Sequence, residues 1–487
     1  MKLGELMRGV ALAGDGIDLE LEISGICCDT RAMTPGTLFV ALSGYKTDGH
    51  RFLKQAVEQG AAAVLCERTE GELDCPVLFT EDTRAALATV AANWFGHPAK
   101  QLCMIGVTGT NGKTTTTCLI KTMLEQAAGA KVGLIGTNRN LIGKLELSAA
   151  RTTPDAYELQ ALLRVMADAG CTHVVMEVSS HALALHRTDG ILFDVGVFTN
   201  LTQDHLDFHK TMEAYRDAKG VLFKQSRLAA LNLDDEAGRW YRERKDCPCF
   251  LYSENKDEAD LTAKNIRLFP DFVEFEAVLR GELCRIHLPI PGGFTIYNAL
   301  AAISCGVSLG IPLPKIAAAL RCAEGVKGRI EVAHTPTAYT VLIDYAHTPN
   351  ALENILVTAR EFTAGRLICL FGCGGDRDRT KRPIMGAIAW ELADVCVVTS
   401  DNPRTEQPEG IISDILEGMP GAVEGERLHV ECDRRAAIRY VLDIARTGDV
   451  VVLAGKGHET YQEVNGVKHH FDERDEVAAY FQTRGKA

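Results

Sequence analysis

The strongest constraint on the fold is an alternation of short apolar runs with helix-length segments along almost the whole chain. The runs start with "GTLFVAL" at residues 36–42 and recur as far as "DVVVLAGKGHE" at residues 449–459. Strands that alternate with helices favour parallel sheets, because each helix carries the chain back to the edge where the next strand begins. The sequence therefore predicts an α/β protein with mostly parallel sheets.

Two breaks divide this pattern. "GHPAKQ" (96–101) has the composition of a linker, and a second break falls at "EGVKGR" (324–329). With 487 residues the chain is too long for one core. We expect three domains, at residues 1–98, 99–329 and 330–487. Strands of the third segment end in loops rich in Gly, Asp, Arg or His, which predicts a binding domain, since ligands bind beyond the carboxyl ends of strands.

Composition limits the environment and the partners. Hydrophobic residues make up 46% and charged residues 24%, as in soluble proteins, and no apolar run approaches the roughly 20 residues that cross a bilayer. The net charge of −13 argues against a nucleic-acid surface. The 16 cysteines include no CxxC pair, and the N-terminal residues make a poor signal peptide. We expect a cytoplasmic monomer with reduced thiols and no membrane insertion.

The segment "VTGTNGKTTTT" has the features of a phosphate-binding loop. Gly109 and Gly112 let backbone amides approach an anion, Lys113 adds a positive charge, and Thr114 can hold Mg²⁺. The spacing is G-x-x-G-K-T, because Val107 stands where the general motif has its first glycine. A chance Gly-Lys-Thr turn is the alternative. The position between a strand and a helix favours ATP binding.

Polar residues follow the next two strands. Glu177 ends one strand, and His205 and His209 lie together in the loop "NLTQDHLDFH". Histidines spaced i, i+4 suggest zinc, whereas a carboxylate near a nucleotide loop suggests magnesium. Because Mg²⁺ prefers oxygen ligands and Glu177 supplies one, we favour magnesium over zinc.

The segment "SDNPR" leaves a strand with two opposite charges, Asp401 and Arg404. Pro403 stops the strand, and the simplest interpretation is a turn with solvated charges. The alternative is that Arg404 faces the carboxylate of a ligand.

Motifs in a fixed order connect these loops: "GTNGKTTTT", "EVSSHAL", "NLTQDHLDFH", "AYRDAKGVLF", "GGFTIYNALAA", "DYAHTPNAL", "FGCGGDRDRTKRPIM" and "AGKGHE". The chain resembles the Mur ligases, ATP-dependent amino-acid ligases of peptidoglycan synthesis, and among them the members that add diaminopimelate. The resemblance implies an N-terminal domain for the UDP end of the substrate, a central P-loop ATPase domain and a C-terminal Rossmann-like domain.

The resemblance also implies site residues. For ATP they are Gly109, Thr110, Asn111, Gly112, Lys113, Thr114, Thr115, Asn298, Arg329, Asp344 and His347. For the metal they are Thr114, Glu177, His205 and Lys219, and the residues implied for catalysis are Lys113, Glu177, His205 and Lys219. For the UDP substrate they are Thr30, Tyr45, Lys46, Thr47, Thr152, Thr153, Ser179 and Arg187. For diaminopimelate they are Arg377, Asp401, Asn402, Pro403, Arg404, Gly455 and Glu459.

Three positions need comment. Lys219 matches a lysine that relatives carry as an N-carbamate (N6-carboxylysine), which converts a cation into an oxygen ligand for Mg²⁺. Without the resemblance it would be taken for a helix-surface lysine. Thr30 stands where serine is usual, and Leu185 where some relatives have glutamine.

The implied reaction joins meso-2,6-diaminopimelate to UDP-N-acetylmuramoyl-L-alanyl-D-glutamate through an acyl phosphate, with ATP and Mg²⁺. One rival is a lysine-adding member of the family. Another is a folyl-polyglutamate type ligase, which is not expected to carry the N-terminal "DTR…LFVALSGYKTDGH" block. A third is a non-catalytic ATP-sensing or scaffold protein, which would be expected to lose some of the catalytic positions.

Overall fold

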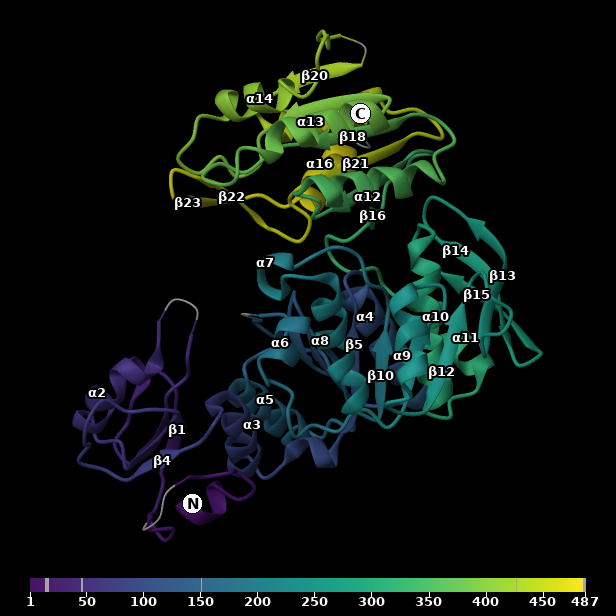
Figure 1. Cartoon of the computed structure of the whole chain (residues 1–487). Helices are drawn as coiled ribbons and strands as arrows, with labels where there is room; N and C mark the ends of the chain where they lie inside the picture. Colours follow the sequence, from purple (N-terminus) through teal and green to yellow (C-terminus); the bar gives the residue numbers. More distant parts are fainter. Residues whose placement is uncertain (14–16, 45–46, 150, 426, 485–487) are drawn as a thin grey trace. The chain divides into compact units, whose positions relative to one another are not determined.

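The computed structural model describes residues 1–13, 17–44, 47–149, 151–425 and 427–484. The chain forms two compact units (Figure 1): Met1–Leu261 with Ala301–Pro312, and Thr262–Leu300 with Leu313–Ala487. The domain boundaries expected from the sequence, at 98/99 and 329/330, stay predictions. No helix in the described ranges combines the length and apolarity that a bilayer crossing requires.

The first unit opens with a four-stranded parallel sheet in the order β1-β2-β3-β4. Leu87 and Val90 of α3 pack on one face of this sheet, and Leu53 and Ala56 of α2 on the other. The elements are α1 (Leu3–Leu6), β1 (Gly25–Cys27), η1 (Thr30–Ala32), β2 (Thr37–Val40), η2 (Gly49–Phe52), α2 (Leu53–Glu58), β3 (Ala63–Cys66), β4 (Val77–Phe79), α3 (Thr83–Trp94) and η3 (Pro98–Gln101).

A second sheet of this unit runs in the order β12-β11-β10-β5-β9-β6-β7-β8, parallel from β12 to β6. Its elements are β5 (Cys103–Thr108), α4 (Lys113–Ala128), β6 (Val132–Ile135), β7 (Asn140–Ile142), β8 (Leu145–Leu147), α5 (Ala156–Asp168), β9 (His173–Glu177), α6 (Ser180–Ala184), β10 (Val195–Phe198), α7 (Leu206–His209), α8 (Met212–Lys224), β11 (Ala229–Asn232), α9 (Glu236–Arg244) and β12 (Cys249–Ser253). Strands β10, β5 and β9 end at the same edge, which brings their loops together.

The second unit carries a six-stranded sheet in the order β16-β17-β21-β18-β19-β20, parallel except for β16. Its elements, with α10, are β13 (Leu261–Leu268), β14 (Val273–Leu279), β15 (Glu282–Leu288), α10 (Phe294–Ser308), α11 (Leu313–Leu320), β16 (Glu331–Ala333), β17 (Thr340–Asp344), α12 (Pro349–Arg360), β18 (Leu367–Phe371), α13 (Lys381–Leu392), β19 (Val395–Thr399), α14 (Pro408–Leu416), β20 (Leu428–Glu431), α15 (Arg434–Ile444), β21 (Val450–Ala454), β22 (Tyr461–Val464), β23 (Val467–His470) and α16 (Glu473–Arg484).

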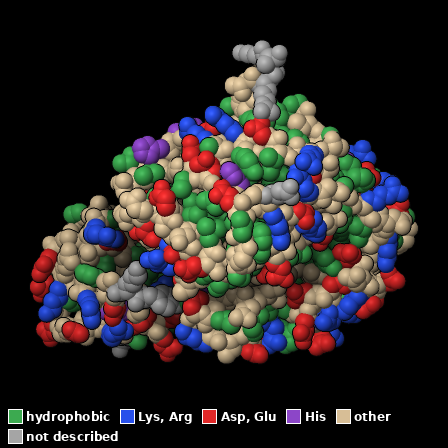
Figure 2. Space-filling model, turned by 90° about the horizontal axis from the view of Figure 1, so that it is seen from above, with side chains coloured by type: hydrophobic (Ala, Val, Ile, Leu, Met, Phe, Trp, Pro, Cys, Tyr) green, Lys and Arg blue, Asp and Glu red, His purple; other side chains and the backbone are tan. Residues whose placement is uncertain are grey.

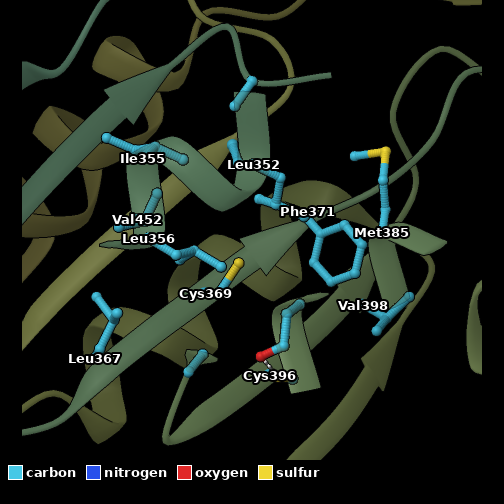
Figure 3. Packing of buried hydrophobic residues seen from close by; sticks show 14 of the residues in the cluster. Leu352, Ile355, Leu356, Leu367, Cys369, Phe371, Met385, Cys396, Val398 and Val452 are labelled. Atoms are coloured by element: carbon cyan, nitrogen blue, oxygen red, sulfur yellow. Dashed lines mark hydrogen bonds between the residues drawn. The ribbon is translucent and has the colours of Figure 1, made fainter. Parts of the chain in front are cut away.

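Helices cover both faces of the six-stranded sheet. Helices α12, α13 and α14 pack on one face against alternate strand residues such as Phe371 and Val398 (Figure 3). Helices α15 and α16 pack on the other face against the intervening residues, such as Leu370 and Val397. The strands are buried on both sides, which explains their continuous apolar runs. The three-layer arrangement confirms the predicted α/β class for this part of the chain.

The surface mixes charges of both signs. On the face shown in Figure 2, Lys and Arg side chains alternate with Asp and Glu. That face therefore does not resemble the clustered basic surface that binds nucleic acid.

Candidate active site

The loop between β5 and α4 is held in a tight conformation. Gly109 has φ +150°, and a Cβ there would lie 1.9 Å from Thr199 Oγ1, so only glycine fits. Lys113 Nζ donates to the carbonyl oxygens of Gly109 and Thr110, at 2.9 Å each. The loop leads into the N-terminus of α4, whose first-turn amides and dipole favour an anion.

The end of β10 clamps this loop from the neighbouring strand. Asn111 N donates to Asn200 Oδ1 at 2.9 Å, and Thr199 Oγ1 donates to Asn111 O at 2.6 Å. Thr110 N donates to Asn200 O at 2.8 Å. These bonds fix the loop backbone before any ligand arrives, which is what a phosphate cradle requires.

Glu177 joins the loop to two further segments. Its buried carboxylate accepts from Thr114 Oγ1 at 3.0 Å, from Thr137 N at 2.9 Å and from Thr137 Oγ1 at 3.0 Å. A hydroxyl and a carboxylate beside a phosphate loop are ligands that suit Mg²⁺. No cluster of three or more His, Cys, Asp or Glu in a metal-binding arrangement occurs among the residues that the structure describes.

Lys219 is buried in α8, not on the helix surface. Its Nζ donates to Gly109 O at 2.8 Å and lies 4.4 Å from the centre of the Tyr215 ring. Burial, and then the nearby charge of Lys113, lower the pKa of Lys219 well below its usual value. The amine therefore loses its proton more readily than an exposed lysine, at a position that touches the phosphate loop.

His205, His181 and His209 form an imidazole cluster near Tyr215. The ring centroids of His181 lie 4.8 Å from His205 and 5.5 Å from His209. Burial, and then His181, lower the pKa of His209 to about 4, and its Nε2 lies 2.9 Å from Ser180 Oγ. His205 lies beside Asp204, with 3.5 Å between Nε2 and Oδ2. The imidazole of His209 is therefore neutral near pH 7.

Four of the residues predicted for the UDP substrate also meet at this edge. Thr153 Oγ1 donates to Glu177 O at 2.9 Å, Ser179 N donates to Thr153 Oγ1 at 3.1 Å, and Arg187 donates to Thr153 O at 2.9 Å. Thr152 Oγ1 accepts from Thr137 Oγ1 at 3.1 Å. Thr153 thus contacts the backbone carbonyl of Glu177, and Thr152 is linked to the Glu177 carboxylate through Thr137.

The predicted UDP residues of the N-terminal sheet are only partly described. Thr30 is buried in η1, and Thr47 is exposed, with its carbonyl accepting from Gly44 N at 3.1 Å. Tyr45 and Lys46 lie outside the described residues.

The remaining predicted ATP residues belong to the second unit. Asn298 is buried in α10. Arg329, Asp344 and His347 lie near the end of β17, where Ile330 N donates to Asp344 Oδ2 at 2.8 Å and His347 Nδ1 lies 2.9 Å from Tyr345 O. Burial raises the pKa of Asp344 to about 6.

The loops after β18, β19 and β21 meet at one edge of the six-stranded sheet. Asp401 and Asn402 are buried, and Gly455, at φ +118°, has no room for a Cβ, which would lie 2.6 Å from Asp401 Oδ2. Asn402 Nδ2 donates to Glu459 Oε2 at 2.9 Å. Asp401 Oδ2 has no hydrogen-bond partner among the described residues.

Arg404 is not a solvated turn residue. Its side chain is 20% exposed, donates to Gly375 O at 2.7 Å and lies 3.4 Å from Glu463 Oε2. Pro403 is buried beside it, whereas Arg377 is exposed and its Nη1 donates to Asp376 O at 3.4 Å. The structure thus brings Asp401, Asn402, Arg404, Gly455 and Glu459 to one edge and leaves Arg377 at its periphery.

Three family models match the chain: the Mur ligase family, catalytic domain at residues 22–94, the Mur ligase middle domain at 107–306, and the Mur ligase, glutamate ligase domain at 328–457. The chain belongs to the Mur ligase family. The family and the fold class expected from the sequence are thereby confirmed.

Two curated Mur ligases are similar over the full length. Proteins of Clostridioides difficile (strain 630) and Syntrophomonas wolfei are 44% and 47% identical, over 98% and 100% of both chains, and each is named UDP-N-acetylmuramoyl-L-alanyl-D-glutamate–2,6-diaminopimelate ligase. A solved structure of a ligase with that name covers 100% of this chain at 32% identity, with a TM-score of 0.77. A folylpolyglutamate synthase of Mycobacterium tuberculosis, at 16% identity and a TM-score of 0.60, shares the fold.

Several residues of this Mur ligase escaped the sequence analysis. Thr137 binds Glu177, and no quoted motif includes it. Asn200 opens the quoted motif "NLTQDHLDFH", but its bond to the phosphate loop appears only in the folded structure. Lys456 stands inside the quoted motif "AGKGHE", but its full burial against Asn402 and Glu459 appears only in the structure. Arg382, also fully buried, holds Glu406 and Asp414 below the same edge.

Proposed function

We propose that this chain is an ATP-dependent ligase that joins meso-2,6-diaminopimelate to the D-glutamyl γ-carboxylate of UDP-N-acetylmuramoyl-L-alanyl-D-glutamate, as a cytoplasmic monomer. The observation that carries the proposal is the similarity over the full chain to relatives named for this reaction. The geometry supplies a matching arrangement, with a phosphate loop at one sheet edge and a partly buried arginine, Arg404, at another.

ATP is proposed to bind with its phosphates at residues 109–115. Lys113 and the amides at the start of α4 compensate the phosphate charge. Thr114 and Glu177 are already within 3.0 Å of each other and would hold Mg²⁺, which neutralises phosphate charge when it is bound. His205 and a modified Lys219 are the other proposed ligands.

Lys219 is proposed to act as a carbamate. Its neutral amine attacks the carbon of CO₂ and loses one proton, which gives an N-carboxylate. The lowered pKa supports this step, because only the unprotonated amine is nucleophilic. The product replaces a buried amine with an anion beside Gly109, where its oxygens could serve as Mg²⁺ ligands.

The ligation is proposed to proceed in two steps. An oxygen of the γ-carboxylate attacks the γ-phosphorus of ATP, the bond to the β,γ-bridging oxygen breaks, and ADP leaves. The α-amine at the L-centre of diaminopimelate then attacks the acyl carbon, inorganic phosphate leaves, and the amine loses a proton. Lys113 stabilises the transferring phosphoryl group, and the edge with Arg404 holds the amine donor.

The rivals differ in the amino acid and in the acceptor. Diaminopimelate has a distal carboxylate that lysine lacks, and Arg404 offers a guanidinium that can bind it in bidentate geometry. A folyl-polyglutamate type ligase would not use a UDP-muramoyl acceptor. A non-catalytic scaffold would not turn over at all.

Ligation assays test the proposal directly. Purified protein, ATP, Mg²⁺ and UDP-N-acetylmuramoyl-L-alanyl-D-glutamate are incubated with meso-diaminopimelate or with L-lysine, and the UDP-tripeptide is quantified. We expect a preference for diaminopimelate of about 10² or more in kcat/KM, because hydrogen bonds to a charged group contribute roughly 1.5–3 kcal/mol and L-lysine has no distal carboxylate to make them with Arg404. Equal use of L-lysine, or ligation only to a folate acceptor, contradicts the proposal.

A further inference from the structure

Lys456 is the fully buried cation of the second unit that lies among the residues expected to bind the amino acid. It follows Gly455 in the loop after β21, and its side chain has no exposed surface. A buried ammonium is costly unless it is paired and hydrogen-bonded. Its presence beneath a binding edge therefore needs a reason in the contacts it makes.

Those contacts are with two residues of that edge. Lys456 Nζ donates to Asn402 Oδ1 at 2.8 Å and to Glu459 Oε2 at 2.9 Å, and lies 5.5 Å from the centre of the Tyr461 ring. Asn402 Nδ2 donates to the same Glu459 oxygen at 2.9 Å. The three side chains form a closed triangle that joins the loop after β19 to the loop after β21.

The triangle fixes the orientation of both partners. Oδ1 of Asn402 accepts from Lys456 and, at 2.9 Å, from Glu463 N, and Nδ2 donates to Glu459, so the amide cannot flip without losing three bonds. Glu459 has one oxygen, Oε2, occupied by Lys456 and Asn402, and its Oε1 has no hydrogen-bond partner among the described residues. The free oxygen is thus held in one direction.

We propose that Lys456 is a positioning residue for the amino-acid substrate: it fixes Asn402 and Glu459 so that Glu459 Oε1 meets the substrate's ammonium group. The inference rests on the proposed function. Lys456 also offsets the negative charge of Glu459 and keeps the carboxylate aligned before the ligand binds. A ligand-binding group that is already fixed loses less conformational freedom when the ligand binds. Lys456 therefore strengthens binding of the amino acid and leaves binding of ATP and of the UDP-dipeptide unchanged.

Steady-state kinetics of Lys456→Met test the proposal. Methionine keeps the length of the side chain and removes the charge and the donors. We expect KM for meso-diaminopimelate to rise about 10-fold or more, with KM for ATP and for the UDP-dipeptide within about twofold of wild type. A rise in all three constants, or in none, overturns the proposal.

A double-mutant cycle separates positioning from general stability. If Lys456 acts through Glu459, Lys456→Met in a Glu459→Gln background should raise KM for diaminopimelate by no more than about twofold further. Effects that multiply in full would show that Lys456 acts independently of Glu459. Should Lys456→Met fail to fold, Lys456→Gln retains one N–H donor, and it should give an intermediate KM; a wild-type KM there overturns the proposal.

Arg366→Met is the matched control. Arg366 pairs with the buried Asp449 at 2.7 Å, and these residues precede β18 and β21, at the opposite edge of the same sheet. Its loss should lower the melting temperature and leave KM for diaminopimelate unchanged; a rise comparable with that of Lys456→Met would show that the effect is merely structural. If wild type ligates no amino acid, the proposed function fails; if it ligates and Lys456→Met keeps its KM, only this inference fails.

Discussion

At the scale of single residues, the candidate site depends on groups whose burial changes their chemistry. Lys219 and Lys113 both donate to Gly109 O, so two amines converge on one carbonyl. The buried amine has the lowered pKa, and the other carries the charge that helps to lower it. The sequence could identify Lys219 only through the family resemblance, because "AYRDAKG" has the composition of an ordinary helix.

Replacing Lys219 should separate activity from stability. We expect Lys219→Met to lose nearly all turnover, since the proposed anionic ligand is gone, yet to unfold no more easily than wild type in buffer free of CO₂. A lysine whose folded pKa lies below its unfolded value of about 10.4 costs stability when protonated. Wild-type stability should therefore rise with pH between the two values, because the unfolded chain binds more protons there.

Thermal unfolding at several pH values and ligation assays measure both effects. Lys219→Met should lack the part of the rise in stability with pH that the lysine causes. Partial rescue of the smaller variant Lys219→Ala by bicarbonate or a short carboxylic acid would support the carbamate. Full turnover without additives would rule it out.

At the scale of elements, continuous apolar runs made the buried parallel strands predictable. Strands β5, β9, β18, β19 and β21 all lie where such runs occur, because strands covered on both faces need no polar positions. The antiparallel hairpins went unpredicted. Hairpin β22–β23 turns at Asn465 and Gly466, both with positive φ, and an Asn-Gly pair is a strong signal for such a turn.

That hairpin braces Arg404, and its turn can be weakened alone. Arg404 N donates to Glu463 O at 3.0 Å, and Asn465 N donates to Arg404 O at 2.7 Å. Gly466 has φ +76° and open space around it, so Gly466→Val strains the backbone without a clash. We expect KM for meso-diaminopimelate to rise several-fold, with KM for ATP unchanged in the same assays.

The hairpin β14–β15 supplies a matched control. Gly281 occupies the equivalent turn position, with φ +93° and equally open space. Gly281→Val should cost similar stability and leave KM for diaminopimelate unchanged. If both variants alter KM alike, the β22–β23 hairpin has no specific role at Arg404.

At the scale of the whole molecule, the sequence predicted the architecture better than the sites. Three segments of alternating strands and helices marked the α/β class, since that pattern depends on local composition. The clamp of Asn200 on the phosphate loop and the triangle around Lys456 depend on loops that only the assembled sheets bring together. Such contacts join residues far apart in the sequence, and no local periodicity of hydrophobic residues predicts them.

The two-unit organisation predicts that the two half-reactions can be removed separately. Lys113 lies in the first unit and Arg404 in the second. With UDP-dipeptide and ATP but no amino acid, Arg404→Ala should still form the acyl phosphate, trapped with hydroxylamine, whereas Lys113→Ala should not. Lys113→Ala should nevertheless bind the UDP-dipeptide in calorimetric titrations, because Lys113 donates to Gly109 O and Thr110 O in the phosphate loop, whereas the UDP end of the substrate is proposed to bind at Thr30 and Thr47. Arg404→Ala should lower kcat/KM for diaminopimelate about 10²-fold or more, with little change in KM for ATP. Loss of acyl phosphate formation in Arg404→Ala would show that the arginine acts in the first step. That result would contradict the assignment of the two half-reactions to separate units.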